Sequence, residues 1–391
     1  MLGGHRWAGW LKNLAPGSFT GPSNIIKLLG LPKEIVSSDL ENDGDPDLFT
    51  LGQVYENLGA SHFAERRPAV VAGSRNFSGD LDGDGIQDLA LPFGDSISWR
   101  KGFGNGQFSG PILMPGLVTT CKQVAGADLD NDGDLDVFAC NGTDALASNA
   151  RFYWFENDGS GHFTGHLIET DIQLCSGAFP LDVNEDGWQD MVLTFFNGQT
   201  SRVYQNHGFG SFSDWVPLLP ANVPAPANIN QSMIVDLDAD ARVDYLYTTK
   251  SWGDQKIACF RNLGPAGFSA EKVLHAWSTN ASWATNYFTV FDASLDGLPD
   301  VLLVDNYWSD FKLIKGLGGS TFASAITVFN SPGYAELYGV SPFDVDRDGK
   351  LDLVFGFRTK DVGGYNQLAT LGNIATAPQA QINILHKVVA C

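Results

Sequence analysis

Seven short segments of the chain carry carboxylates at a spacing that suits a divalent cation. Each follows the pattern Asp-x-[Asp/Asn/Glu/Ser]-x-Asp-[Gly/Ala]-x-x-Asp. We number them loops 1 to 7, and their residues positions 1 to 9; they are residues 39–47, 80–88, 128–136, 182–190, 236–244, 292–300 and 344–352. Calcium takes about six to eight oxygen ligands, and a glycine at position 6 permits a sharp turn around the ion. The pattern therefore predicts a calcium loop in each segment.

Positions 1, 3, 5 and 9 would supply side-chain oxygens, and position 7 would supply its main-chain carbonyl. The predicted ligands are Asp39, Glu41, Asp43, Asp45, Asp47, Asp80, Asp82, Asp84, Ile86, Asp88, Asp128, Asp130, Asp132, Asp134, Asp136, Asp182, Asn184, Asp186, Trp188, Asp190, Asp236, Asp238, Asp240, Arg242, Asp244, Asp292, Ser294, Asp296, Leu298, Asp300, Asp344, Asp346, Asp348, Lys350 and Asp352. We expect up to seven Ca²⁺ ions with a structural role.

Two alternatives to this kind of calcium loop fit the pattern less well. A single copy could be an ordinary Asp-rich turn, because Asp and Gly favour turns, but seven copies in register argue against this. The helix-loop-helix calcium hand requires a Glu at position 12 and flanking helices, which the pattern lacks. Ala241 at position 6 and Ser294 at position 3 predict weaker binding or distortion in loops 5 and 6.

The overall charge agrees with calcium binding. The chain has 24 basic and 45 acidic residues, a formal charge of −21, and more than half of the acidic residues lie in the loops. Most of the acidic residues would then serve as metal ligands. A polyanion of this kind is not expected to bind nucleic acid or an anionic membrane, and no apolar run is long enough to span a bilayer.

The loops repeat about every 50 residues, a period typical of stacked supersecondary units. Each loop is followed by a short β-rich apolar run such as Val137-Phe138-Ala139, and then by a second strand that ends in an Asn-x-Gly turn leading to Phe, as at 157–163. We name the four strands of a unit A to D, with the acidic loop between A and B. Four antiparallel strands in about 50 residues indicate a propeller blade. The sequence therefore predicts an all-β fold, a single seven-bladed β-propeller over residues 1–391.

Both ends of the chain contain strand patterns. Residues 7–19 have the pattern of a strand C followed by its turn, and residues 367–373 and 382–389 have the patterns of further strands. We expect the two termini to close the ring by sharing the last blade, since this removes an open sheet edge. Which terminus supplies which strand stays open.

With these loops, the chain resembles the FG-GAP/VCBS repeat superfamily over residues 7–375; the integrin α-subunit propeller is its best-known member. As a single domain it is similar to the fungal seven-bladed lectins of the Psathyrella velutina type. The resemblance implies a calcium-stabilised propeller and a carbohydrate ligand of the N-acetylglucosamine type. The superfamily also includes adhesion modules and polysaccharide lyases, and a fold does not by itself fix an activity.

The loops on the face opposite the calcium loops vary most, and they carry aromatic rings beside polar groups. Such rings stack on a pyranose while polar groups bind its hydroxyls; packing between blades is the alternative role. The candidate ligand-binding residues are Trp252, Asp254, Trp283, Trp308, Asp310, Tyr334, Glu336, Tyr338 and Arg358. The leading expectation is a lectin that binds a glycan or another small polar ligand.

An enzyme is the second hypothesis, and a protein-adhesion module is the third. A polysaccharide lyase or cyclase needs a base and a cation that stabilises developing negative charge. The residues that could supply these are Lys250, Arg358, Lys360, Tyr307 and Tyr365. No histidine lies clearly in these loops, so whether the chain has any catalytic activity stays open, with binding favoured.

The cysteines and the calcium loops bear on the compartment. Cys121 and Cys175 precede their loops by the same distance, so they either form a disulfide or remain two buried thiols. Weak calcium sites are tolerated outside cells, where calcium is abundant. We therefore expect an extracellular or cell-surface protein, although residues 1–14 do not have a signal-peptide pattern.

Overall fold

The computed structural model describes the chain from Arg6 to Thr359 with internal gaps. The residues outside the description are 1–5, 12, 16–17, 20–22, 28–35, 42, 51–52, 60–61, 67–75, 117–120, 142–150, 171, 173–174, 196–199, 220–225, 227–228, 250–254, 265–266, 278–286, 295, 306–309, 320, 331–334, 346–350 and 360–391. All the named elements of the described part are β-strands. No helix in that part has the length and apolar character needed to cross a membrane.

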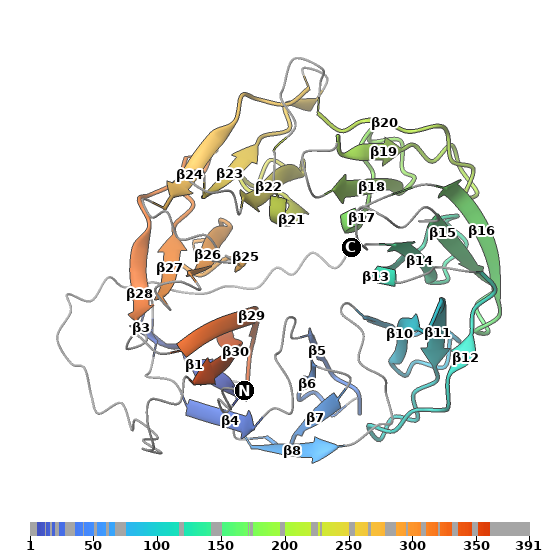
Figure 1. Cartoon of the computed structure of the whole chain (residues 1–391), viewed down its shortest axis with the longest axis horizontal. Coiled ribbons are helices and arrows are strands. Elements are labelled where there is room, and N and C mark those ends of the chain that lie inside the picture. Colours follow the sequence, from blue (N-terminus) through green and yellow to red (C-terminus); the bar gives the residue numbers. More distant parts are fainter. Residues whose placement is uncertain are drawn as a thin grey trace. The chain divides into compact units, whose positions relative to one another are not determined.

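By its internal contacts the chain divides into two compact units, which we describe separately. One holds the N-terminal strands, Asp45–Arg66 and the chain from Met233 onward, and the other holds Ser38–Gly44 and Arg67–Ser232. The described residues form seven four-stranded antiparallel sheets and one two-stranded sheet. Six of the four-stranded sheets use four consecutive strands (Figure 1). The predicted four-stranded antiparallel blades of an all-β propeller are confirmed.

The second unit contains three complete sheets. They are β9 (Phe77–Gly79), β10 (Asp88–Phe93), β11 (Ser96–Arg100) and β12 (Ile112–Leu113); β13 (Cys121–Ala127), β14 (Asp136–Asn141), β15 (Arg151–Asn157) and β16 (Phe163–Thr170); and β17 (Cys175–Leu181), β18 (Asp190–Phe195), β19 (Arg202–Tyr204) and β20 (Val216–Pro217).

Four further sheets lie wholly or mainly in the first unit. They are β5 (Val36–Ser38), β6 (Asp47–Thr50), β7 (Gln53–Asn57) and β8 (Phe63–Arg66); β21 (Ile229–Val235), β22 (Asp244–Thr249), β23 (Lys256–Phe260) and β24 (Lys272–Ala276); β25 (Tyr287–Phe291), β26 (Asp300–Asp305), β27 (Asp310–Ile314) and β28 (Ile326–Asn330); and β29 (Ala335–Phe343), β30 (Asp352–Thr359), β1 (Arg6–Leu11) and β4 (Ser23–Lys27). The two-stranded sheet pairs β2 (Asn13–Ala15) with β3 (Ser18–Phe19).

The strand that follows each acidic loop begins at position 9 of the loop, as the short apolar runs predicted. These strands are β6, β10, β14, β18, β22, β26 and β30. All six residues of β18 and of β22 are buried, whereas the fourth strand of the blade, such as β16 or β24, is largely exposed or half-buried. A strand covered on both faces needs a continuous apolar run.

Apolar clusters join neighbouring sheets within each unit. In the second unit, Phe138 and Trp154 pack with Met191 and Phe195 between β13–β16 and β17–β20. In the first unit, a second cluster joins β25–β28 to β29 and β30 through Phe311 and its neighbours. Burial of aromatic side chains of this size is a main source of stability in such packing.

One sheet combines strands from the two ends of the described chain. β30 pairs with β29 on one side and with β1 on the other, and β1 pairs with β4. The later part of the chain thus supplies strands A and B of this sheet, and the N-terminal part supplies strands C and D. The strands predicted at 367–373 and 382–389 lie outside the described residues.

The disulfide differs from the pairing raised by the sequence. Cys175 of β17 is bonded to Cys140 of β14, with a Cα–Cα distance of 6.6 Å, and Cys121 is buried and is not part of this disulfide. The equal spacing of Cys121 and Cys175 before their loops is a spacing along the chain. Bond formation depends on which strands adjoin, and β17 lies next to β14 in the packed sheets.

Candidate functional site

The first aspartate organises each described acidic loop. Its two carboxylate oxygens accept the main-chain N–H groups of positions 5 and 6. In loop 2 these bonds run from Asp84 and Gly85 to Asp80, at 3.1 and 2.8 Å. Loops 1, 3, 4, 5 and 6 have the same pair of bonds. The repeated spacing therefore encodes one repeated loop structure.

Position 6 adopts a left-handed backbone in all six of these loops. The glycines there have φ between 80° and 97°. Ala241 has φ 67° and keeps the bond from its N–H to Asp236 at 2.9 Å. The expected distortion of loop 5 is therefore not present in its backbone, although an alanine in this region is strained.

Position 9 is a buried tie between strands, a role that the spacing did not reveal. Asp136 is fully buried; one of its oxygens accepts the N–H of Leu129 at 3.0 Å and the other that of Asn157 at 2.8 Å. Burial raises the pKa of Asp136 to about 7, although these two backbone bonds oppose the rise. Burial likewise raises the pKa of Asp88 to about 6. The tie fixes where strand C ends beside the loop.

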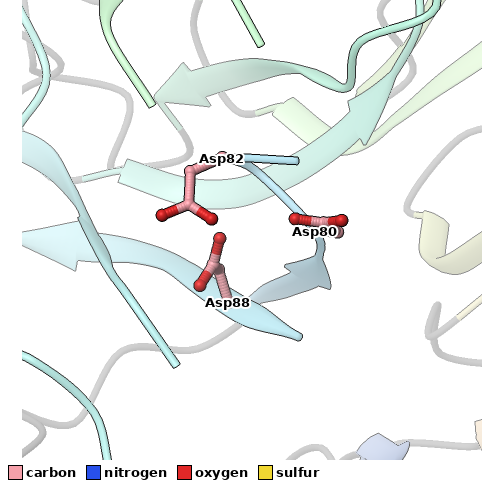
Figure 2. A group of neighbouring side chains, drawn as sticks. All are labelled: Asp80, Asp82 and Asp88. Atoms are coloured by element: carbon pink, nitrogen blue, oxygen red, sulfur yellow. The ribbon is translucent and has the colours of Figure 1, made fainter. Parts of the chain in front are cut away.

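Among the described residues, three loops bring three carboxylate oxygens within 4.8 Å of one another. The groups are Asp80, Asp82 and Asp88; Asp128, Asp130 and Asp132; and Asp236, Asp238 and Asp244. Figure 2 shows the first group, with the carboxylates of Asp82 and Asp88 facing each other and Asp80 beside them. A set of hard oxygen donors of this kind fits a calcium or similar divalent cation. Asp346, Asp348 and Lys350 of loop 7 lie outside the described residues.

In loops 2, 5 and 6, basic side chains of the described residues reach the carboxylates. The ammonium group of Lys101 contacts Asp82 and lies 2.6 Å from Asp84. Its hydrogen bond is the main cause of the lowered pKa of Asp84. Arg261 contacts Asp238, and similar pairs occur between Arg261 and Asp240 and between Lys315 and Asp296. The sequence patterns did not single out these basic residues.

At Asn157 and Asn206, the asparagine that ends strand C ties its blade to the acidic loop of the preceding blade. The side-chain amide of Asn157 donates to the carbonyl of Leu81, position 2 of loop 2, at 2.9 Å. Asn206 donates in the same way to Leu129 of loop 3, at 2.6 Å. The Asn-x-Gly turn therefore does more than reverse the chain. It holds the acidic loops of successive blades in place.

The candidate ligand-binding residues are only partly described. Trp252, Asp254, Trp283, Trp308 and Tyr334 lie outside the described residues, as do the enzyme candidates Lys250, Tyr307, Lys360 and Tyr365. Asp310 begins β27, Glu336 and Tyr338 lie near the start of β29, and Arg358 lies near the end of β30. Glu336 is the register partner of Arg358. In their sheets, these positions lie at the ends opposite the acidic loops.

One carboxylate oxygen of Asp310 has no hydrogen-bond partner among the described residues. Its side chain is buried, and one carboxylate oxygen lies 3.1 Å from the ammonium group of Lys312. The other oxygen is buried and has no hydrogen-bond partner among the residues that the structure describes. Asp310 is the register partner of Asp305 and closes the 306–309 loop, which contains Tyr307 and Trp308.

A second polar and aromatic cluster was missed from the sequence. Arg202 donates to Glu169 at 2.8 Å, and its guanidinium lies 4.6 Å from the ring centre of Trp215. Tyr204 donates a hydrogen bond to the same glutamate. These residues come from two adjacent sheets, so a search for local motifs could not join them. Their charged groups already pair with one another.

Comparisons with known proteins agree with the architecture. The FG-GAP-like repeat model matches residues 80–139, 182–247 and 292–355. Each matched stretch begins at the first aspartate of one acidic loop and includes the next loop. No curated protein matches the chain in sequence.

Among solved structures, the chain is similar to an Agrocybe aegerita lectin that recognises non-reducing terminal N-acetylglucosamine. The identity is 16%, the match covers 84% of this chain and 91% of the lectin, and the TM-score is 0.60. A Pseudomonas aeruginosa periplasmic gluconolactonase matches at 14% identity over 84% of this chain and 97% of that chain, with a TM-score of 0.46. At these identities the lectin match supports the fold alone.

Proposed function

We propose that this chain, an all-β propeller with FG-GAP-like repeats, is a calcium-stabilised protein that binds carbohydrate. The observation that carries the carbohydrate part is Asp310. It presents a buried oxygen without a described partner beside a loop that contains Tyr307 and Trp308. A buried acceptor of this kind is usually satisfied by hydrogen bonding. A sugar hydroxyl would supply the donor while an aromatic ring covers the sugar's apolar face.

As part of this proposal, we extend the ligand class of the lectin with the similar fold to the present chain. That protein recognises non-reducing terminal N-acetylglucosamine, so we propose a terminal sugar of this type for the present chain. We also propose that the seven four-stranded sheets are the seven blades of one ring, and that Trp252, Trp283, Trp308, Tyr334 and Arg358 contribute to the ligand face. The protein would act outside the cell or at its surface.

Calcium would be held by the side chains of positions 1, 3, 5 and 9 of the acidic loops. Bound there, it would neutralise carboxylates that the fold gathers and would connect the end of strand A to the start of strand B. An ion that binds only the folded chain stabilises it by about 2.7 kcal/mol per site at a free concentration of 100 times Kd.

A glycan array probed with the calcium-loaded protein tests the ligand class. We expect binding to defined terminal sugars, with N-acetylglucosamine among them. Failure to bind any glycan, with the fold intact in calcium, would contradict the proposal. The next assays would then follow consumption of uronate polysaccharides, because the enzyme hypothesis places Lys250 and Arg358 on the same face.

Two matched variants locate the site. Trp308→Ala removes the tryptophan two residues before Asp310 in the sequence and should weaken binding to the best array sugar about three- to tenfold, the value of a lost aromatic contact. Trp215→Ala removes an exposed tryptophan that already stacks on Arg202, and it should leave binding unchanged. Equal effects of the two variants would place the site elsewhere.

A further inference from the structure

In six blades, the turn between strands C and D is preceded by a residue that occupies the same structural position. In these blades an Asn or Gly forms an antiparallel bridge with the Phe that ends the turn, as Gly102 does with Phe108. The main-chain N–H of that Asn or Gly donates to the position 9 aspartate of the same blade. We call the residue before it the pre-bridge residue; the six are Glu56, Lys101, Glu156, Gln205, Arg261 and Lys315.

The backbone around the pre-bridge residue is the same in blades where its side-chain type differs. The carbonyl of Lys101 accepts an N–H from the far side of the turn at 2.8 Å, and that of Gln205 accepts the equivalent bond at 2.9 Å. Arg261 and Lys315 have the same bond at 2.8 Å. The backbone therefore brings each pre-bridge side chain to the same place, and only its chemistry varies.

Where the pre-bridge residue is basic, its side chain forms ion pairs with carboxylates of the acidic loop in the same blade. Lys101 contacts positions 3 and 5 of loop 2, Arg261 contacts positions 3 and 5 of loop 5, and Lys315 lies 3.0 Å from position 5 of loop 6. These are the oxygens that calcium would use. A tethered cation is present at a high effective concentration, so an incoming ion must displace it.

Loops 3 and 4 have a pre-bridge residue that is not a cation. Among the described residues of loops 2 to 6, ion pairs between basic side chains and the carboxylates of positions 1, 3, 5 and 9 occur only in loops 2, 5 and 6. The pre-bridge residue of loop 3 is Glu156, which bonds instead to His166 at 2.7 Å. That of loop 4 is Gln205, which has no charge.

We propose that the pre-bridge residue divides the acidic loops into two classes. In loops 2, 5 and 6 the side chain of Lys101, Arg261 or Lys315 takes the place of the metal, whereas loops 3 and 4 bind a divalent cation. This inference rests on the calcium part of the proposed function. It changes the expectation of one calcium per repeat, because a loop that satisfies the sequence pattern can already be neutralised by its own chain.

Calcium stoichiometry in three variants tests the division. The chelated protein is dialysed to equilibrium against calcium, and bound ions per chain are counted. Lys101→Gln should gain one ion, because the carboxylates of loop 2 lose their internal cation. Gln205→Lys should lose one ion, since it copies Lys101 into loop 4. Lys256→Gln is the matched control: it removes a lysine that pairs with Glu271 outside the loops, and the count should stay unchanged.

The outcomes separate this inference from the proposal on which it rests. If the wild type binds calcium and Lys101→Gln leaves the number and affinity of bound ions unchanged, the division into classes is wrong while calcium binding stands. If neither the wild type nor Lys101→Gln binds calcium, the calcium proposal itself fails. Should Gln205→Lys not fold, Lys315→Gln provides a second test by gain, with one added ion expected at loop 6.

Discussion

Position 6 of the acidic loops shows how one residue type can be exchanged at a cost while the local structure stays the same. Five of the six described loops place glycine there, and loop 5 places Ala241 in the same left-handed region at φ 67°. Residues other than glycine rarely adopt this backbone conformation, because their Cβ atom comes too close to the following carbonyl oxygen. The bonds to Asp236 hold the alanine in place.

Ala241→Gly should therefore stabilise the protein. Relief of the left-handed strain is worth about 1 kcal/mol, partly offset by the greater freedom of glycine in the unfolded chain. Urea unfolding at fixed calcium would show a higher midpoint. Ala270→Gly is the control, since Ala270 is exposed and outside the left-handed region, and it should be neutral or destabilising. A lower midpoint for Ala241→Gly would contradict the strain argument.

The buried aspartate at position 9 gives a second prediction for a single residue. Asp136→Asn replaces one of two accepting oxygens with an amide that cannot accept, leaving a buried N–H of Leu129 or Asn157 unpaired. The loss should be about 1–3 kcal/mol of unfolding free energy, measured by chemical denaturation. Asp214→Asn changes an exposed aspartate and should have almost no effect. A similar result for both variants would show that the tie has no energetic importance.

At the scale of the strand and loop, much of the structure could be predicted from the sequence. The apolar runs marked strand B because that strand is covered on both faces, and the Asn-x-Gly turns marked the end of strand C. The interactions between blades could not be predicted this way. The amide of Asn157 reaches Leu81, 76 residues away, and the contacts of Lys101 and Arg261 with the loops depend on how strand C is placed. A motif of about ten residues cannot predict contacts between residues so far apart in the sequence.

The disulfide between Cys140 of β14 and Cys175 of β17 gives a testable prediction about how strands are joined. Non-reducing peptide mapping should join the peptides of Cys140 and Cys175 and should join neither of them to the peptide of Cys121. The double variant Cys140→Ala/Cys175→Ala should lose roughly 2–4 kcal/mol of stability, because the cross-link between β14 and β17 no longer restricts the unfolded chain. A peptide that joins Cys121 to Cys175 would show that the described pairing is wrong.

At the scale of the whole chain, repetition was the informative signal. Seven similar loops predicted four-stranded antiparallel blades, and the sheets and the FG-GAP-like repeat match confirm them. Repetition left open which end of the chain supplies which strands of the last sheet. The structure answers this, because β1 and β4 from the N-terminal part complete the sheet that β29 and β30 begin. The ligand face was less predictable. The candidate residues differ from blade to blade, and among them Asp310 combines a described side chain with an oxygen that lacks a described partner.

Glycan binding with and without calcium is the most direct test of the proposed function. The sugar that binds best on the array is immobilised, and binding of the protein is measured in calcium, in excess chelator and after calcium is restored, with thermal unfolding recorded in each state. We predict that chelation lowers the melting temperature and weakens sugar binding, and that added calcium restores both. Unchanged stability and unchanged binding in chelator would contradict a calcium-stabilised lectin, and absence of sugar binding in calcium by the folded protein would contradict carbohydrate recognition.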